Sequence, residues 1–243
     1  MIDNKKVLAI VPARSGSKGL KNKNILSLKG KPLVSYPINA ANKSLYIDRV
    51  MVSTDSNTLA NIASKHGAEI PYIRPSALAT DEALSSDVII HLLKLLEDQL
   101  KDYEYLVFLE PTSPLTSHED IDEALKTLVN SKKHTALVSV AKVESTHPDF
   151  CLSIKDNQIL PYKSQHLNNL TRRQDLEDLY FIDGSIYISK ISDFLVKKTF
   201  YHEDTFPFKV PYWKSLEIDT YLDLVCVEAI VDNIREIKIN NDE

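Results

Sequence analysis

The sequence predicts an α/β fold, in which a mainly parallel sheet carries helices on both faces. Short apolar runs rich in β-branched residues alternate along the chain with stretches of helical periodicity. Those runs are continuously apolar, which is typical of parallel strands buried on both faces. The 243 residues, 43% hydrophobic and 26% charged, have the size and composition of an ordinary globular domain, so we expect residues 1–243 to form a single domain.

The expected elements follow one another as repeated strand–helix units. Ser117 stands three residues before Asp120, the pattern of a capping box, and marks the start of one helix. In chain order we expect a strand at 7–13, a helix at 32–43, a strand at 49–54, helices at 58–66 and 87–100, a strand at 105–111, a helix at 119–129 and a strand at 135–140.

The strand–helix alternation ends after Val140. Residues 150–162 read as a hairpin around Asp156 and Asn157, and 181–189 read as another strand. We interpret residues 144–184 as an excursion from the sheet that serves dimerisation, because apolar strands without a covering helix must bury their face elsewhere. The chain ends with a helical stretch at 222–236.

Composition and charge exclude several classes of protein. No apolar run approaches the length that spans a bilayer, and two cysteines without metal or redox spacing fit a reducing cytoplasm. The net charge of −5 argues against wrapping nucleic acid. The charge is uneven, however: residues 4–47 hold nine basic residues and no acidic one, whereas the chain from Glu203 onward holds ten acidic and four basic residues. This asymmetry favours a small polyphosphate bound together with a cation.

The loop after the first expected strand, residues 12–24, has the chemistry of a phosphate-binding loop. It holds two of the five glycines, Gly16 and Gly19, among lysines and an arginine. Glycine lets backbone N–H groups close around phosphate oxygens, and the cations neutralise them. The spacing matches neither a P-loop nor a dinucleotide fingerprint. A solvated turn is the alternative, which the loop's place at the carboxyl edge of a sheet disfavours.

The ordered motifs of the chain resemble those of the CMP-sialic acid synthetase family, cytidylyltransferases for nine-carbon α-keto acid sugars. The first loop resembles the family's A-R-x-x-S-K-G-x-x-x-K-N pattern. The similarity extends along nearly the whole chain through VSTDS (52–56), RPSALATDEALSSD (74–87), EPTSPL (110–115), RRQDL (172–176), GSIYI (184–188) and EIDTYLD (217–223).

The resemblance implies a Rossmann-like nucleotidyltransferase domain that binds CTP. It assigns the CTP phosphates to Arg14, Lys18 and Lys23, whose fixed charges stabilise the negative charge that builds up at the α-phosphate. It assigns the rest of the nucleotide site to Ala13, Ser17 and Asn24 in the loop and to Arg74, Ser85 and Ser86 around cytosine. For Arg74, which precedes a proline, a surface position is the alternative.

The acidic pair Glu217 and Asp219 is the expected metal site. Two residues apart at the end of an expected strand, both side chains point to one face and can bind a hard divalent cation. Mg²⁺ suits few carboxylates plus substrate phosphates, so we expect Mg²⁺ as the cofactor. Helix N-capping by Asp219 is the alternative. Members of the family usually carry two aspartates here, so Glu217 is a departure.

The resemblance places the sugar against Glu110, Asp183 and Tyr187. Relatives commonly carry Gln and Asn at the first two positions, and a carboxylate only accepts hydrogen bonds, so these exchanges favour a sugar with additional N–H donors such as legionaminic acid. Glu110 paired with a lysine and Tyr187 in the core are the alternatives. Arg172 and Arg173 are candidates for the sugar carboxylate, across the dimer interface.

We therefore expect a cytoplasmic, homodimeric transferase that uses CTP to activate a nonulosonic acid, that is, a sialic-acid-like sugar, to its CMP-sugar. Pyrophosphate leaves in this reaction, and neither nucleic acid nor a membrane takes part. Two alternatives remain: a cytidylyltransferase for an eight-carbon keto acid, and a non-catalytic nucleotide sensor. The carboxylates at 217 and 219 disfavour the sensor, because sensing does not require them.

Overall fold

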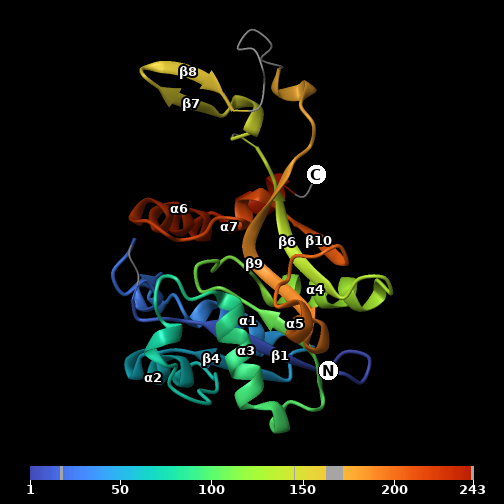
Figure 1. Cartoon of the computed structure of the whole chain (residues 1–243). Coiled ribbons are helices and arrows are strands. Elements are labelled where there is room, and N and C mark those ends of the chain that lie inside the picture. Colours follow the sequence, from blue (N-terminus) through green and yellow to red (C-terminus); the bar gives the residue numbers. More distant parts are fainter. Residues whose placement is uncertain (17–18, 145, 163–171, 242–243) are drawn as a thin grey trace.

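The structure, a computed structural model, describes residues 1–16, 19–144, 146–162 and 172–241, with Arg173 and Asn241 described by their backbone alone. Its centre is a six-stranded sheet in the order β10-β6-β9-β5-β1-β4 (Figure 1). Every neighbouring pair is parallel except those of β9, which runs antiparallel to both β5 and β6. The strands are β1 (Lys6–Pro12), β4 (Arg49–Ser53), β5 (Tyr103–Phe108), β6 (Ala136–Lys142), β9 (Tyr180–Lys190) and β10 (Thr205–Val210).

Helices cover both faces of this sheet, as the sequence predicts. Alternate residues of β1 point to opposite faces, so Val7, Ala9 and Val11 pack on one layer of helices while Leu8 and Ile10 pack on the other. The first layer is α1 (Ser35–Lys43), α2 (Asn57–Lys65) and α4 (His118–Asn130). The second is α3 (Ser85–Leu95) and α5 (Ile191–Lys197). The expected α/β class and the mainly parallel sheet are confirmed.

Several boundaries differ from the expected ones. The first helix begins at Ser35 rather than at residue 32, because β2 (Ser27–Leu28) and β3 (Lys31–Pro32) form a small hairpin. Lys29 and Gly30 make its turn, with φ of 49° and 79°. The helix expected over 87–100 breaks after α3 into the short helix η3 (Glu97–Gln99). The remaining short helices are η1 (Lys23–Ile25), η2 (Ser76–Leu78), η4 (Pro148–Phe150), η6 (Arg173–Asp175) and η7 (Tyr212–Lys214).

Two capping boxes fix helices beside the carboxyl edge of the sheet. The expected one at the start of α4 forms: Ser117 accepts from the backbone of Asp120, whose side chain accepts in return from Ser117. Lys214 adds an ion pair of 2.6 Å to the same carboxylate. The second box joins Thr220 and Asp223 at the start of α6 (Tyr221–Asp232), and the helical stretch then breaks at Asn233 before α7 (Ile234–Asn241).

Between β6 and β9 the chain leaves the sheet and forms an arm, which we define as residues 143–179. Its hairpin, β7 (Leu152–Lys155) and β8 (Gln158–Pro161), turns at Asp156 and Asn157 with φ of 51° and 59°, as expected. The arm stands off the body beyond α6 (Figure 1). The expected excursion at 144–184 overlaps the sheet at its end, because Tyr180, Phe181 and Ile182 already pair with β6.

No helix among the described residues is long and apolar enough to cross a membrane.

Candidate active site

A cleft of about 540 Å³ opens at the carboxyl edge of the sheet, where open α/β folds bind ligands. The loop after β1, the residue after β5 and the turn before α6 bring their polar side chains together there. Of the residues predicted for the site, seven line this cleft: Arg14, Lys23, Asn24, Arg74, Ser85, Glu110 and Asp219.

The loop after β1 is held in place by contacts with the chain around it. Asn24, 7% exposed, donates from Nδ2 to the carbonyl of Arg14 at 2.9 Å, and buried Ala13 donates its N–H to the carbonyl of Ser53 at 2.9 Å. Gly19 passes so close to the turn before α6 that a Cβ there would lie 2.5 Å from the carbonyl oxygen of Asp219. Glycine at 19 is therefore needed for this approach. Ser17 and Lys18, also predicted for the site, lie outside the described residues.

Two cations of the loop, Arg14 and Lys23, are paired with acids. Arg14 Nη1 lies 2.6 Å from Asp81 Oδ1, and Lys23 Nζ lies 2.6 Å from Asp219 Oδ1. Sequence reasoning missed Asp81, which belongs to the loop between η2 and α3 and also lines the cleft. An acidic residue in a segment already matched to the nucleotide site was the only signal for it. Two cations and two acids thus share the space that a polyphosphate is expected to take.

Arg74 is 5% exposed, so the alternative of a surface residue is wrong. Its guanidinium donates to the hydroxyl of Ser53 at 3.1 Å, to the carbonyl of Ser53, and to the carbonyl of Leu78 at 3.3 Å. Burial lowers its pKa from the ordinary value, and Asp55 opposes the shift. Arg74 is therefore a fixed donor at the back of the cleft. Ser85 lines the cleft nearby, whereas Ser86 lines only the adjoining cavity described below.

Glu217 and Asp219 do not lie at the end of a strand as expected, but in the turn between η7 and α6. They still face the same region, because buried Ile218 between them anchors the turn by donating its N–H to the carbonyl of Thr112 at 2.8 Å. Thr220, not Asp219, is the N-cap of α6, so the capping alternative is wrong. The side chain of Asp219 instead binds Lys23.

Four carboxylates gather around this turn: Glu110, Asp183, Glu217 and Asp219. Burial raises the pKa of Glu217 to about 7, and Glu110, Asp219 and Asp183 add to the shift. Burial also raises the pKa of Glu110, against the influence of Lys23. Asp183 is 1% exposed, and its Oδ2 has no hydrogen-bond partner among the described residues. The region is therefore rich in negative charge that the described protein groups neutralise only in part.

Gly184 lets Glu217 reach this position. Its φ is +76°, and a Cβ there would lie 1.6 Å from Oε1 of Glu217. No group of three or more His, Cys, Asp or Glu side chains in the described part of the chain is arranged to hold a metal ion by itself. The carboxylates are nevertheless the oxygen donors that a hard cation binds together with ligand phosphates.

A second cavity of about 260 Å³ adjoins the cleft, since Glu110 and Ser85 line both. Tyr187 is 9% exposed and lines this cavity; burial and Tyr201 raise its pKa far above the ordinary value. Phe200 and Tyr201 form the opposite wall and were missed, since nothing in their local sequence shows that they face Tyr187. The cavity has apolar walls and polar groups toward the cleft.

Arg172 is not brought to the cleft of its own chain. It lies on the arm, where its Nε pairs with Asp175 Oδ2 at 3.2 Å, and it is exposed. The backbone of Arg173 begins η6 on the same arm, and its side chain lies outside what the structure describes.

Comparisons with known proteins bear on the family and the fold of this chain. A family model described as Cytidylyltransferase matches residues 8–238. The chain is 33% identical to the CMP-N,N'-diacetyllegionaminic acid synthase of Legionella pneumophila, over 93% of this chain and 97% of that protein. It is 36% identical to an N-acylneuraminate cytidylyltransferase of Escherichia coli over 97% of its length, but spans only 54% of that longer relative. Among solved structures, CMP:2-keto-3-deoxy-manno-octonic acid synthetase in complex with CTP superposes with a TM-score of 0.68 at 15% identity, covering 94% of this chain and 99% of that one.

Proposed function

This chain belongs to the cytidylyltransferase family, and on that premise we propose that it transfers CMP from CTP to a nonulosonic acid. The observation that carries the proposal is the convergence of Arg14, Lys23 and Arg74 with Glu110 and Asp219 at one cleft on the carboxyl edge of the sheet, with the carboxylates of Glu217 and Asp183 close behind them. Relatives named for legionaminic acid, N-acylneuraminate and pseudaminic acid support a nine-carbon acceptor. The eight-carbon alternative has the support of a structural likeness at 15% identity, which speaks for the fold alone.

In the proposed reaction the anomeric hydroxyl oxygen of the sugar forms a bond to the α-phosphorus of CTP. The bond from that phosphorus to the bridging oxygen breaks, pyrophosphate leaves, and the hydroxyl proton is released. Arg14 and Lys23 lie where they can stabilise the charge that grows on the phosphate oxygens. Arg74 fixes the nucleotide from the back of the cleft. These positions follow from the resemblance and from the residues that line the cleft.

We propose Mg²⁺ as the cofactor, with Asp219 and Glu217 as the residues that would hold it. The raised pKa of Glu217 and the unpartnered Oδ2 of Asp183 both indicate negative charge that a cation would relieve. When bound with CTP, the ion supplies Lewis-acid charge stabilisation at the phosphates. Lys23, now paired with Asp219, would then turn to the nucleotide.

We further propose that the preferred sugar is a diamino nonulosonic acid of the legionaminic type. The buried acceptor on Asp183 and the half-buried carboxylate of Glu110 require donors, and an additional acylamino N–H supplies one. The lysine alternative for Glu110 is weakened, because Lys23 Nζ is already bound to Asp219. The adjoining cavity, with Tyr187, Phe200 and Tyr201 around it, offers apolar walls for the acyl group.

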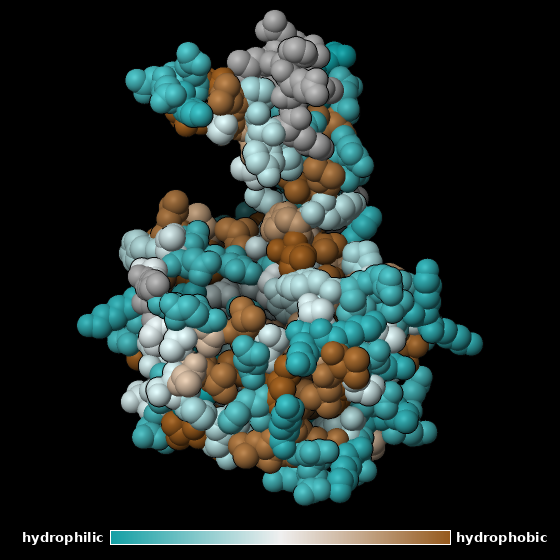
Figure 2. Space-filling model, viewed as in Figure 1, coloured by the Kyte–Doolittle hydropathy of each residue, from teal (hydrophilic) through white to brown (hydrophobic). Residues whose placement is uncertain are grey.

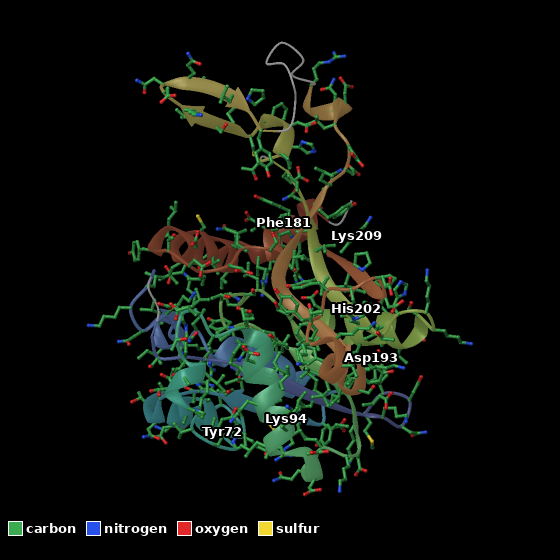
Figure 3. The ribbon with its side chains drawn as sticks, viewed as in Figure 1. Tyr72, Lys94, Phe181, Asp193, His202 and Lys209 are labelled. Atoms are coloured by element: carbon green, nitrogen blue, oxygen red, sulfur yellow. The ribbon has the colours of Figure 1, made fainter. Side chains whose placement is uncertain are left out.

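We propose that the working form is a homodimer joined through the arm. The arm leaves large apolar side chains exposed, which Figure 2 shows at the surface where the arm overhangs a notch above the body. Phe181, labelled in Figure 3, lies at the root of the arm. The exposed residues include Leu152 (46%), Ile154 (79%), Ile159 (53%), Leu160 (42%) and Tyr162 (75%). A second copy of the chain would bury this face, and Arg172 and Arg173 of one copy would then lie near the cleft of the other.

We also propose that this enzyme works in the cytoplasm, where its unpaired cysteines stay reduced.

The test of the proposed function is an assay of purified protein for pyrophosphate release and CMP-sugar formation. CTP and Mg²⁺ are supplied with N-acetylneuraminic, diacetyllegionaminic, pseudaminic or eight-carbon keto acids. We expect turnover with nine-carbon acids, fastest with the diamino sugar. Turnover with the eight-carbon acid alone, or with no acid, would refute the proposal. Light scattering at micromolar concentration tests the dimer, and a monomer would refute it.

A further inference from the structure

A chain of polar side chains, buried at Ser53 and half-buried at Tyr72 and His91, lies behind Arg74 and outside the lining of the cleft. Ser53, the last residue of β4, is fully buried and accepts from Arg74 twice, through its hydroxyl at 3.1 Å and through its carbonyl. The hydroxyl of Tyr72 lies 3.5 Å from that of Ser53 and 3.0 Å from Nδ1 of His91. Tyr72 packs beside α3, the helix that also carries Lys94 (Figure 3). The chain thus links β4, Arg74 and α3.

One direction of the hydrogen bonds along this chain satisfies every member, with His91 in the tautomer that accepts at Nδ1. Arg74 can only donate, so the hydroxyl of Ser53 must accept from it and turn its own proton elsewhere. The phenol of Tyr72 is the neighbouring acceptor, and it can pass its proton toward Nδ1 of His91. Each member is thereby held in one orientation by the next. A serine hydroxyl without these neighbours would rotate, and the guanidinium would keep only its bonds to the carbonyls of Ser53 and Leu78, with none at Nε.

The orientation of the Arg74 guanidinium matters because it aims the N–H donors that remain for a ligand in the cleft. Arginine carries five N–H donors, and Ser53 and Leu78 take the one on Nε and one on each terminal nitrogen. One N–H on each terminal nitrogen is left for the cleft that Arg74 lines. Cytosine presents two adjacent acceptors, O2 and N3, whereas uracil presents O2 beside an N3–H donor. Two parallel donors therefore match cytosine and oppose uracil, but only when the guanidinium plane is fixed.

We propose that Ser53 is a positioning residue that orients Arg74 for cytosine over uracil, with Tyr72 and His91 holding the hydroxyl of Ser53. The inference rests on the proposed function, because it takes the nucleotide in the cleft to be CTP. Ser53 touches no ligand in this scheme and acts only through Arg74. A merely structural serine would change stability and leave the choice between nucleotides as it was.

The experiment compares Ser53→Ala and Tyr72→Phe with the unmodified full-length chain. The matched controls are Ser189→Ala, which removes a fully buried hydroxyl on β9 that donates to the carbonyl of Lys190, and Tyr105→Phe, which removes a buried phenol on β5. Each protein is assayed for kcat and KM with CTP and with UTP, using whichever sugar supports turnover. Calorimetric binding of both nucleotides without sugar and thermal melting are measured in parallel.

We expect Ser53→Ala to raise KM for CTP roughly tenfold with kcat within about twofold, since one bond to a charged, buried group is lost. The ratio of kcat/KM for CTP over UTP should fall by about the same factor, because UTP gains nothing from the fixed plane. Tyr72→Phe should lower this ratio about threefold, and it tests the role of Ser53 if Ser53→Ala does not fold. Both control variants should have the same CTP-over-UTP ratio of kcat/KM as the unmodified protein.

An unchanged ratio in Ser53→Ala or, where that variant is unfolded, in Tyr72→Phe overturns the inference, as does an equal fall in the controls. If the unmodified protein shows no turnover with any sugar, the proposed reaction fails. The calorimetric preference for CTP over UTP, and its loss in the variants, then still decides the role of Ser53.

Discussion

The substitution Gly184→Ala should displace the carboxylate of Glu217 while the chain stays folded. The glycine has φ +76°, and a methyl group there would lie 1.6 Å from Oε1 of Glu217. Carbon and oxygen in van der Waals contact need roughly twice that separation, so the carboxylate must move by more than about 1 Å. A misplacement of that size at a reacting centre costs on the order of 10²-fold in rate. We expect kcat to fall by that factor and the Mg²⁺ concentration for half-maximal turnover to rise.

The matched control is Gly30→Ala, in the turn between β2 and β3. Its φ of +79° imposes the same backbone strain, but nothing lies within 4 Å of the added methyl. Either substitution should cost about 1–2 kcal/mol for the left-handed conformation, which lowers Tm by roughly 2–8 °C in a chain of this size. Thermal melting and pyrophosphate release against Mg²⁺ are measured on both variants. Only Gly184→Ala should lose turnover.

A double substitution sharpens the test. Glu217→Asp shortens the side chain that meets the new methyl, and the resemblance makes aspartate the usual residue there. Glu217→Asp alone should keep activity, and Gly184→Ala with Glu217→Asp should recover much of what Gly184→Ala loses. Full turnover in Gly184→Ala alone would refute the reasoning, because the carboxylate could then be displaced without consequence. Equal losses in Gly184→Ala and Gly30→Ala would refute it as well.

Three further predictions concern charged residues of the site. Arg14→Ala and Lys23→Ala should each lower kcat/KM by roughly 10²-fold or more with little change in Tm. Lys21 is an exposed lysine of the same loop, and the control variant Lys21→Ala should keep kcat/KM. Near-normal kinetics in both Arg14→Ala and Lys23→Ala would show that the loop takes no part in the reaction. Burial raises the pKa of Glu217 from 4.5 to about 7, so the stability that its protonated form contributes is present below pH 4.5 and lost as pH rises through 7. In EDTA, the Glu217→Gln variant should therefore have a free energy of unfolding up to ~3 kcal/mol above that of the unmodified protein at pH 8, and an equal one near pH 4. Denaturant unfolding at the two pH values measures this difference. Equal stabilities at pH 8 would contradict the raised pKa of Glu217. Glu110→Gln should narrow the preference in kcat/KM for diacetyllegionaminic over N-acetylneuraminic acid, and a gap unchanged by the substitution would exclude Glu110 from sugar choice.

The parts of the fold that the sequence predicted are those governed by local pattern. The apolar runs at β1, β4 and β5 indicate strands buried on both faces; β1 and β5 lie inside the sheet, and β4 is buried although it is the last strand of the sheet. The direction of β9 is not encoded in such a pattern, since a strand is equally apolar whichever way it runs. Its antiparallel course follows from the route of the arm, which returns the chain to the same edge of the sheet that β6 left.

The site residues also divide into those that local sequence predicts and those that it does not. Arg14 and Glu110 each stand two residues past the end of a parallel strand, β1 and β5, so their meeting at one edge follows from parallel strands alone. Asp81 and Tyr201 reach the site from loops whose course depends on packing far along the chain; the neighbours of Tyr201 in sequence carry no sign of it, and those of Asp81 mark the segment but not the residue. The expectation that Glu217 and Asp219 point to one face assumed a strand, and the structure has a turn there. A buried residue between them, Ile218, and not strand geometry, fixes the turn that places Asp219 at the cleft and Glu217 against Gly184.

Lys23 and Arg14 are each paired with an acid in the resting site, and this bears on how nucleotide and metal bind in the proposed reaction. Lys23 and Asp219 satisfy each other at 2.6 Å, as do Arg14 and Asp81, and the four side chains are 16%, 64%, 32% and 34% exposed. Ion pairs that water reaches contribute only about 0–1 kcal/mol, so exchanging them for phosphate contacts costs little. When the triphosphate takes Lys23, the carboxylate of Asp219 loses its cation beside Glu217, whose pKa is already raised by its acidic neighbours. Nucleotide binding then increases the demand for a divalent cation at the same carboxylates. Each ligand should therefore bind more tightly in the presence of the other, and a protein of net charge −5 can hold a polyanion without a permanently bare basic surface.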